Sequence, residues 1–370
     1  MSILDKIIVK ENQQIAILQT LKLSRKPILV YGAGVYAYVV IKYLRALGVE
    51  VAKIVVDAAY KKENTFLGLE VLAVEDVICD LRDFHVVIGT SNYPVAIGRL
   101  KNFGIDDPIV IDIPDFLNIP APFMNYDFVS SNQARLETAY DLLEDDLSRQ
   151  TFIAAINTKI NEDTGFIKPF VQLDHLYFAQ TEFPVGEDEI LLDVGGYNGD
   201  SIRDFIKVTN GKFRHIVSLE PFPKLYADLL STIRDLGIAD KCSAIQAGAW
   251  SQEGTLPFNV TDCEIDSKVV TNPLHGGHSI VVRRIDDILG DIRMDVTFIK
   301  MDINGSEYHA LKGAFGTITR CKPRLAIKMH VKEDFYRLPI LLKEISPDIK
   351  LFLRQRNYMS MMLVLYGIYI

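Results

Sequence analysis

The sequence predicts an α/β protein with two doubly wound domains, each built on a mostly parallel sheet. Apolar, strand-like runs alternate with helical stretches in two separate series, which is the pattern of a parallel sheet covered on both faces. Between the two series, residues 113–123 (IPDFLNIPAPF) contain three prolines in eleven residues. The chain has 370 residues, which is enough for two hydrophobic cores.

Residues 1–23 are expected to form an amphipathic helix, because their isoleucines and leucines fall roughly on one side. A Rossmann-like domain, of the type that binds nucleotides or nucleotide sugars, is then expected over 24–115. Its strands are predicted at 27–31, 51–57, 69–72, 85–90 and 108–113, and its helices at 35–47, 73–81 and 93–103. Residues 116–164 are expected to be a linker and a helical pair, at about 131–146 and 148–161.

The second series defines a domain over 165–370. Its strands are predicted at 189–194, 215–220, 242–247, 296–302, 324–329, 349–354 and 361–368. The last two have no room between them for a crossover helix, so they should pair antiparallel. A parallel sheet closed by an antiparallel hairpin is similar to the sheet of class I S-adenosylmethionine-dependent methyltransferases.

Composition excludes several classes of protein. The net charge is −8 and the basic residues form no stripe, so nucleic acid is not the expected partner. The cysteines are widely spaced, which argues against a structural zinc site and a disulfide framework and favours the cytoplasm. We expect no signal peptide and no membrane span, since residues 359–370 are apolar but too short to cross a bilayer. No metal site is predicted.

The glycine-rich turn in LLDVGGYNGDS (191–201) follows a predicted strand and has an aspartate on each side. A Walker loop would need Lys after its last glycine, but Gly199 is followed by Asp200. A bound diphosphate would face Asp200, at roughly 4 kcal/mol per charge pair for ~4 Å and an effective dielectric of 20. The turn therefore disfavours a phosphate ligand.

S-adenosylmethionine suits this turn better, because it carries a sulfonium and an ammonium but no phosphate. Asp193 could meet the ammonium, while three glycines would let the backbone approach the methionine part. These glycines are Gly195, Gly196 and Gly199. Asn198, Asp200 and Ser201 could cap the next helix or reach the ligand. The alternative for both aspartates is strand-end solvation and helix capping.

Two further strand ends fit the same cofactor. Glu220 lies 27 residues after Asp193, where a carboxylate could accept both ribose hydroxyls. Pro221 and Phe222 could then cover the adenine. The third strand is followed by Gly248, Ala249 and Trp250, which could border the adenine, although a lone tryptophan is as often part of a core.

Several stretches together resemble the FkbM-type methyltransferases over roughly 165–370. They are LLDVGGYNGDS, SLEPFP, AGAWSQEG, RRIDDIL, FIKMDINGSEYHALKGA and the stretch from KPRLAIKMH to LFLR. The resemblance implies an S-adenosylmethionine-dependent O-methyltransferase of natural products or saccharides. The family usually has a glutamate where this chain has Asn304, and a His-His pair where it has Met329 and His330.

The expected chemistry is an in-line methyl transfer to a hydroxyl, which depends on alignment and gains from a general base. Asp302 and His330 end the fourth and fifth strands of the second series. Histidine titrates near neutral pH, so we predict His330 as the base and Asp302 as the residue that aligns the substrate or the sulfonium. Both could instead be structural, and Glu307 is expected to support the loop.

The first series contains a second glycine pattern, Gly32-x-Gly34-x-x-Ala37, between a strand and a helix. Asp57 ends the next strand, which completes the layout of a dinucleotide site. The stretch 66–77 resembles the N-terminal modules of nucleotide-sugar-modifying enzymes. This domain is therefore expected to be either a nucleotide or nucleotide-sugar site or a scaffold for a homodimer.

The leading hypothesis is an O-methyltransferase that acts on a saccharide or a related small polyhydroxylated metabolite. The rival is an NAD(P)-dependent oxidoreductase that uses the first domain, and a third option is a dimeric, non-enzymatic nucleotide-binding protein.

Overall fold

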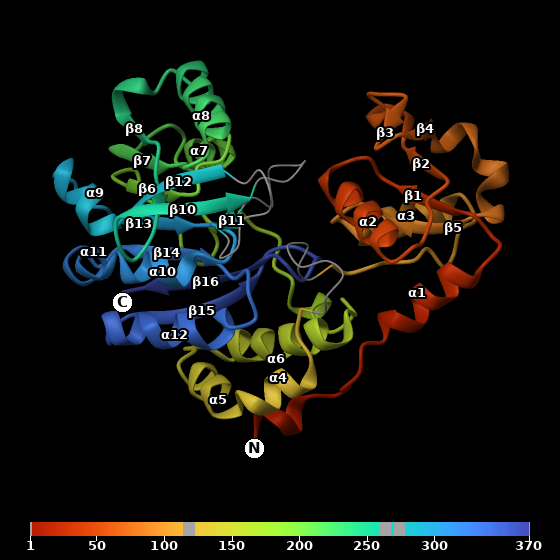
Figure 1. Cartoon of the computed structure of the whole chain (residues 1–370), viewed down its shortest axis with the longest axis horizontal. Coiled ribbons are helices and arrows are strands. Elements are labelled where there is room, and N and C mark those ends of the chain that lie inside the picture. The colour runs from red at the N-terminus through yellow and green to blue at the C-terminus, as the bar shows by residue number, and fades with distance from the viewer. Residues whose placement is uncertain (1, 114–122, 260–267, 270–277, 370) are drawn as a thin grey trace. The chain divides into compact units, whose positions relative to one another are not determined.

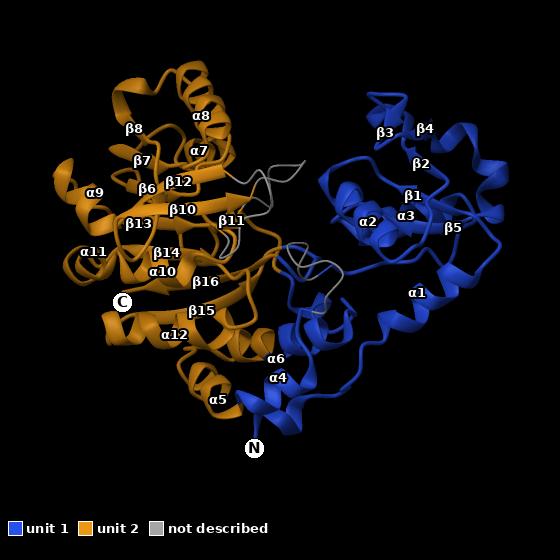
Figure 2. Cartoon of the chain, viewed as in Figure 1, with its two compact units in different colours: residues 1–132, 153–171, 357–361 blue, residues 133–152, 172–356, 362–370 orange. Residues whose placement is uncertain are grey.

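The computed structural model describes residues 2–113, 123–259, 268–269 and 278–369 (Figure 1). The chain divides into two compact units, and each unit draws on several stretches of sequence (Figure 2). Unit 1 comprises residues 1–132, 153–171 and 357–361. Unit 2 comprises residues 133–152, 172–356 and 362–370. Within the described ranges, no helix combines the length and apolar character needed to cross a membrane.

Unit 1 contains a five-stranded sheet in the order β3-β4-β2-β1-β5. Its strands are β1 (Ile28–Tyr31), β2 (Lys53–Val56), β3 (Thr65–Phe66), β4 (Leu69–Ala73) and β5 (His85–Ile88). All pairings are parallel except that of β3 with β4. The two α-helices within this series are α2 (Val35–Ala46) and α3 (Tyr93–Asn102). The predicted alternation of parallel strands and helices is therefore present, with β3 as an additional strand that was not predicted.

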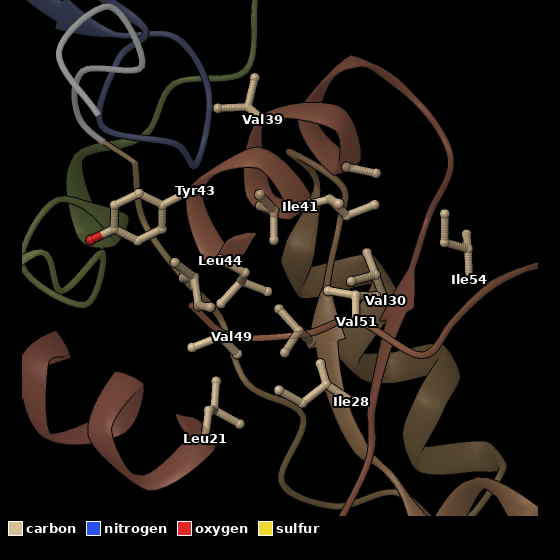
Figure 3. Close-up of a cluster of buried hydrophobic side chains, with 14 of the residues drawn as sticks. Leu21, Ile28, Val30, Val39, Ile41, Tyr43, Leu44, Val49, Val51 and Ile54 are labelled. Atoms are coloured by element: carbon tan, nitrogen blue, oxygen red, sulfur yellow. The ribbon is translucent and has the colours of Figure 1, made fainter. Parts of the chain in front are cut away.

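The sheet strands and α2 both contribute apolar side chains to the core of unit 1 (Figure 3). Val30 and Ile54 of the sheet pack with Ile41 and Leu44 of α2, and all four side chains are buried. The strands of this sheet are apolar at consecutive positions because side chains on both faces of the sheet are buried.

Three predictions for unit 1 were wrong. Residues 1–23 form a short 3₁₀ helix (Ile3–Lys6) and α1 (Gln14–Leu23) rather than one helix. The backbone between them is held by asparagines of α6: Asn157 accepts from the Ile8 N–H at 2.8 Å, and the Asn161 carbonyl accepts from the Gln13 N–H at 3.2 Å. These tertiary hydrogen bonds override the helical periodicity.

The other two wrong predictions concern the stretches 73–81 and 108–113. The stretch 73–81 forms 3₁₀ turns (Val74–Asp76 and Ile78–Asp83) instead of an α-helix. The stretch 108–113 makes a single parallel bridge, Ile109 with Val87, instead of a strand. Its ladder does not continue because the Asp112 N–H donates to the side chain of Gln14 at 2.8 Å.

The helices between the two series are α4 (Tyr126–Ser131), α5 (Gln133–Asp141) and α6 (Asp146–Asn161). The predicted pair corresponds to α5 and α6, while residues 126–131 form an additional helix. The linker residues 114–122 lie outside the described residues.

Unit 2 contains a seven-stranded sheet in the order β15-β16-β14-β13-β6-β7-β8. Its strands are β6 (Ile190–Val194), β7 (His215–Leu219), β8 (Cys242–Ile245), β13 (Phe298–Met301), β14 (Arg324–Lys328), β15 (Lys350–Gln355) and β16 (Leu363–Ile368). The first five are parallel to one another, and β16 is antiparallel to both β14 and β15. The predicted α/β fold with its closing hairpin is confirmed.

The helices of unit 2 follow the strands in the expected alternation. They are α7 (Asp200–Val208), α8 (Pro223–Asp235), α9 (Ile285–Asp291), α10 (Glu307–Lys312), α11 (Phe315–Cys321) and α12 (Asp334–Ile345). Aromatic side chains fill the core: the ring centroid of Phe178 lies 5.2 Å from that of Phe205 and 5.4 Å from that of Phe298. Offset and tilted pairs of this kind add to the burial free energy.

A second, four-stranded sheet in unit 2 was not predicted. It has the order β11-β10-β12-β9 and comprises β9 (Gly248–Ala249), β10 (Gly254–Asn259), β11 (Lys268–Val269) and β12 (His278–Arg283). Residues 260–267 and 270–277 lie outside the described residues.

Replacing each of the two glycines in the turn after β1 should show which of them is required by packing. Gly32 has φ +126°, and a Cβ there would lie 2.5 Å from the Gly89 carbonyl oxygen, whereas a Cβ on Gly34 would meet nothing within 4 Å. Gly32→Ala should therefore destabilise unit 1 by about 1–3 kcal/mol from backbone strain alone, and Gly34→Ala by less than about 0.5 kcal/mol. Amide hydrogen exchange of β1 and β5 measures the difference; equal protection in the two variants would contradict it.

Candidate active site

The carboxyl ends of β6, β7, β13 and β14 meet at one edge of the large sheet, where open α/β sheets bind ligands. The glycine turn after β6 lies against this edge. Gly195 has φ +88°, and a Cβ on it would lie 2.2 Å from the Asp302 carbonyl oxygen. Gly195 is thus required by a close approach of two backbones. A Cβ on Gly196 would similarly lie 2.3 Å from the Ser218 hydroxyl.

Asp193 is completely buried beneath the glycine turn. Its carboxylate lies 3.0 Å from Nζ of Lys300, which is also buried, and accepts from the Ser218 hydroxyl at 2.8 Å. Nζ of Lys300 also donates to the Gly195 carbonyl at 2.6 Å. Burial raises the pKa of Asp193, and the Lys300 ammonium opposes this effect. Asp193 is therefore charge-paired within the protein and holds the turn through Lys300.

The residues that follow the turn have different environments. Asp200 is exposed at the start of α7, and Ser201 behind it is buried. The Asn198 carbonyl accepts from the Thr232 hydroxyl at 2.7 Å. A Cβ on Gly199, which has φ +83°, would lie 2.6 Å from the Thr232 methyl group. Of the two aspartates predicted for the cofactor, Asp200 is the one that faces solvent.

Glu220 is buried where β7 ends. One carboxylate oxygen accepts from the Tyr197 N–H and the other from the Phe222 N–H, both at 2.9 Å. Burial raises the pKa of Glu220 to about 7, although these backbone donors oppose the shift. Glu220 therefore links the glycine turn to α8 and keeps a carboxyl group that is close to its titration point at neutral pH.

The predicted adenine-contacting residues are brought to the same side of unit 2. Pro221 approaches Gly248 of β9. Phe222 is buried and packs against Phe258 of β10, with ring centroids 6.2 Å apart. Ala249 is buried in β9, next to Trp250. Phe222 thus belongs mainly to a small core beneath the second sheet.

Trp250 stacks on a residue that the sequence analysis did not single out. Its ring centroid lies 4.0 Å from that of His309 on α10, with an interplanar angle of 13°. Burial lowers the pKa of His309, and the nearby Arg337 and Lys312 charges lower it further. One face of the tryptophan is therefore covered by a neutral imidazole.

Asp302 and His330, the two predicted catalytic residues, are in contact. Nε2 of His330 lies 2.6 Å from Oδ1 of Asp302 and 3.6 Å from Oε1 of Glu307. The other oxygen of Asp302 accepts from the Tyr177 hydroxyl and lies 3.5 Å from Nζ of Lys328. Burial opposes ionisation of Asp302, but Lys328 and His330 outweigh it and hold the pKa of this carboxyl well below its usual range.

Glu307 supports the loop between β13 and α10. Its two oxygens accept from the backbone N–H groups of Ile303 and Gly305, both at 2.8 Å. The loop includes Asn304 with φ +52° and Gly305 with φ +95°, and the two hydrogen bonds hold it in this shape. Burial raises the pKa of Glu307, followed by the charge of Asp334, while His330 opposes the shift.

Asp302, Glu307 and His330 also lie close enough together to be tested against a metal ion. One donor atom from each falls within 4.8 Å of the others. The Lys328 ammonium beside Asp302 supplies a positive charge to the same cluster, and the Glu307 oxygens already accept two backbone hydrogen bonds. The cluster therefore brings two carboxylates, an imidazole and the Lys328 ammonium together, and a divalent cation there would compete with this ammonium for Asp302.

The predicted second nucleotide site in unit 1 has a different character. Asp57 accepts from the Tyr31 hydroxyl at 2.7 Å and from Nε of Arg99 at 2.5 Å. Arg99 also pairs with Glu75 at 3.0 Å. A carboxylate that serves a ribose in a dinucleotide site would have to exchange these partners. Gly32 is explained by its approach to Gly89, and Gly34 is the glycine that leaves open space.

Comparison with known proteins agrees with the fold of unit 2. Residues 193–359 match the family model described as methyltransferase FkbM domain. These residues are therefore similar to FkbM methyltransferase domains, and we call them the FkbM domain below. The match supports methyltransferase activity.

Solved structures show the same fold. The FkbM methyltransferase from Methylobacillus flagellatus KT aligns with a TM-score of 0.66 at 22% identity, over 99% of this chain and 97% of that chain. The precorrin 8W decarboxylase from Methanobacterium thermoautotrophicum aligns with a TM-score of 0.32 at 11% identity, over 50% of this chain and 83% of that chain; similarity this low adds no argument. No curated protein matches the sequence.

Three site residues of the FkbM domain and its flanks were missed by sequence reasoning: Lys300, Tyr177 and His309. Lys300 had a usable signal, because a lysine within the apolar strand FIKM is rarely buried without a charged partner. Tyr177 is separated from Asp302 by 125 residues, and no local pattern joins them. His309 lies two positions after Glu307 and has no distinctive spacing.

The single tryptophan should report protonation of His309. A protonated imidazole quenches a stacked indole, and the pKa of His309 is lowered. We therefore expect Trp250 fluorescence to stay constant from pH 8 to about 6.5, the ordinary histidine value, and to fall only below it. His309→Phe keeps a ring on the indole and should abolish the transition, whereas His278→Phe should leave it unchanged. A transition that persists in His309→Phe would contradict the assignment.

Proposed function

We propose that the FkbM domain is an S-adenosylmethionine-dependent O-methyltransferase that acts on a hydroxyl of a saccharide or a related polyhydroxylated metabolite. The observation that carries the proposal is the contact between His330 and the ionised Asp302, at the strand edge on which the Gly195 turn packs. A histidine backed by a carboxylate is suited to removing a proton from a weakly acidic hydroxyl. We also place the protein in the cytoplasm, which fits the cysteines that are free among the described residues, Cys79, Cys242 and Cys321.

The residues of the turn fit this cofactor. Asp193 is neutralised by Lys300, so the exposed charge beside the turn is that of Asp200. A pyrophosphate at ~4 Å from it would cost roughly 4 kcal/mol per charge pair, and an ammonium or sulfonium would gain a similar amount. We assign the ammonium to Asp200, the methionine part to the backbone at Gly195, Gly196 and Gly199, and the ribose hydroxyls to Glu220.

The proton arrangement follows from the contacts of His330. Its Nε2 faces the carboxylates of Asp302 and Glu307, so this nitrogen carries the proton and donates it toward Asp302. Nδ1 then keeps the lone pair that accepts the proton of the acceptor hydroxyl. The imidazolium that forms is stabilised by the same two carboxylates. When bound, S-adenosylmethionine supplies the methyl group on a positively charged sulfur.

Cofactor binding should depend on pH through Glu220. Ribose hydroxyls donate hydrogen bonds to the ionised carboxylate, and the pKa of Glu220 in the free protein is about 7. Ligand affinity should therefore rise several-fold from pH 6 to pH 8, because the protein must lose a proton to accept the diol. Isothermal titration with S-adenosylhomocysteine measures this. Glu220→Gln should bind weakly and without the pH dependence, while NADH should not bind at this site.

Catalysis should depend on His330 more than cofactor binding does. With radiolabelled methyl donor and a panel of saccharides, His330→Ala should lower kcat by about 10²–10⁴-fold and Asp302→Asn should lower it as well, with little change in S-adenosylhomocysteine affinity. Mass spectrometry of small molecules retained through purification would guide the choice of acceptor. Near-normal transfer in both variants would remove the catalytic assignment, and stimulation by added Mg²⁺ that EDTA reverses would replace it with a metal-assisted reaction.

A further inference from the structure

Tyr177 contributes the one aromatic hydroxyl that contacts Asp302 among the described residues. It lies in the segment before β6, upstream of the residues that match the FkbM domain. Its side chain is buried, and its ring packs beside Phe178 with ring centroids 6.3 Å apart. Nζ of Lys300 lies 5.2 Å from the centroid of the same ring. The ring is thereby fixed from two directions, which fixes the hydroxyl.

The Asp302 carboxylate is divided between two sets of partners. Oδ1 faces Nε2 of His330, while Oδ2 receives the Tyr177 hydroxyl and faces the Lys328 ammonium. Burial, followed by the charge of Asp302, raises the pKa of Tyr177 well above its usual value. Tyr177 therefore remains protonated and acts as a donor at all pH values at which the protein would work.

We propose that Tyr177 is a positioning residue that acts through Asp302: its hydroxyl takes up part of the carboxylate charge and so sets how strongly His330 holds a proton. This inference rests on the proposed role of His330 as the base. A hydrogen bond donated to a carboxylate stabilises its charge, so the carboxylate attracts a neighbouring proton less. Tyr177 thus competes with His330 for the charge of the carboxylate that both side chains contact.

The groups that face His330 define what a test must hold constant. Asp302 and Glu307 face its Nε2, and its backbone N–H donates to Asp334 at 3.1 Å. Asp334 in turn pairs with Arg337 at 3.1 Å. Lys328 acts on Asp302 from β14. Within this network Tyr177 hydrogen-bonds to Asp302, so removal of its hydroxyl acts directly on that link.

Tyr177→Phe deletes the hydroxyl and keeps the ring. The pH at which His330 is half-protonated should then move upward by about 0.5, because Asp302 regains the charge that Tyr177 had taken up. This midpoint can be followed by NMR of ¹³Cε1-labelled histidine, with the His330 signal assigned by its loss in His330→Gln. The chain has seven histidines, which is few enough to resolve. No shift, or a downward shift, would overturn the proposal.

Tyr226→Phe is the matched control. Tyr226 packs against the same aromatic core, and its hydroxyl donates to the Ala244 carbonyl at 3.2 Å, away from Asp302. It should leave the His330 midpoint unchanged. If Tyr226→Phe moved the midpoint as far as Tyr177→Phe does, the effect would reflect general loosening of the core and the proposal would fail.

A second variant keeps the test independent of the stability of Tyr177→Phe. 3-Fluorotyrosine placed at position 177 alone keeps the shape of the ring but makes its hydroxyl a stronger donor. It should move the His330 midpoint in the opposite direction, downward, and an upward shift would overturn the proposal. Neither measurement needs a cofactor or an acceptor. Failure of S-adenosylhomocysteine to bind would therefore count against the proposed function while leaving the Tyr177 measurement interpretable.

Discussion

The close approach of Gly195 to Asp302 joins the two halves of the site. A side chain at 195 would collide with the Asp302 carbonyl, so the turn that follows β6 can lie against the end of β13 only because this residue is glycine. Hydrogen bonds from the Gly195 and Gly196 N–H groups to the Leu219 carbonyl, at 3.0 and 2.8 Å, fix the same turn to the end of β7. The distance between the glycine turn and the Asp302–His330 pair is consequently set by main-chain packing.

The charges around this contact are arranged in pairs. Lys300 neutralises Asp193 below the turn and binds the Gly195 carbonyl, and Lys328 faces Asp302 beyond it. Unpaired charges at this depth would be strongly destabilising, whereas paired charges with hydrogen bonds are tolerated. One consequence is that the deepest aspartate is structural and the exposed Asp200 remains available for a cationic ligand. The electrostatic preference for a positively charged donor thus rests on Asp200 rather than on the pair of aspartates that flank the turn.

The sequence was sufficient to predict the sheet of unit 2 and most of the residues at its carboxyl edge, because strands buried on both faces and their terminal polar residues have a clear local pattern. It did not predict Tyr177 or the pairing of Asp193 with Lys300, since both depend on contacts between residues more than 100 positions apart. The errors in unit 1 have the same origin. The amphipathic pattern of residues 1–23 was real, but the amide groups of Asn157 and Asn161 offer the backbone better partners than a helix would.

The two glycine turns show why such a motif is ambiguous until its surroundings are known. Both follow a buried strand and both precede a helix, and in each one glycine is required because another backbone lies within contact distance. They differ in the nearest carboxylates. In unit 1 Asp57 is bound by Tyr31 and Arg99, so the carboxylate that would recognise a ribose is already satisfied by the protein. In unit 2 the hydrogen bonds to Glu220 within the described residues come from backbone N–H groups, and Asp200 is exposed. A carboxylate that retains acceptor capacity can serve a ligand, and this difference in partners, rather than the spacing of the glycines, favours unit 2 as the cofactor-binding unit.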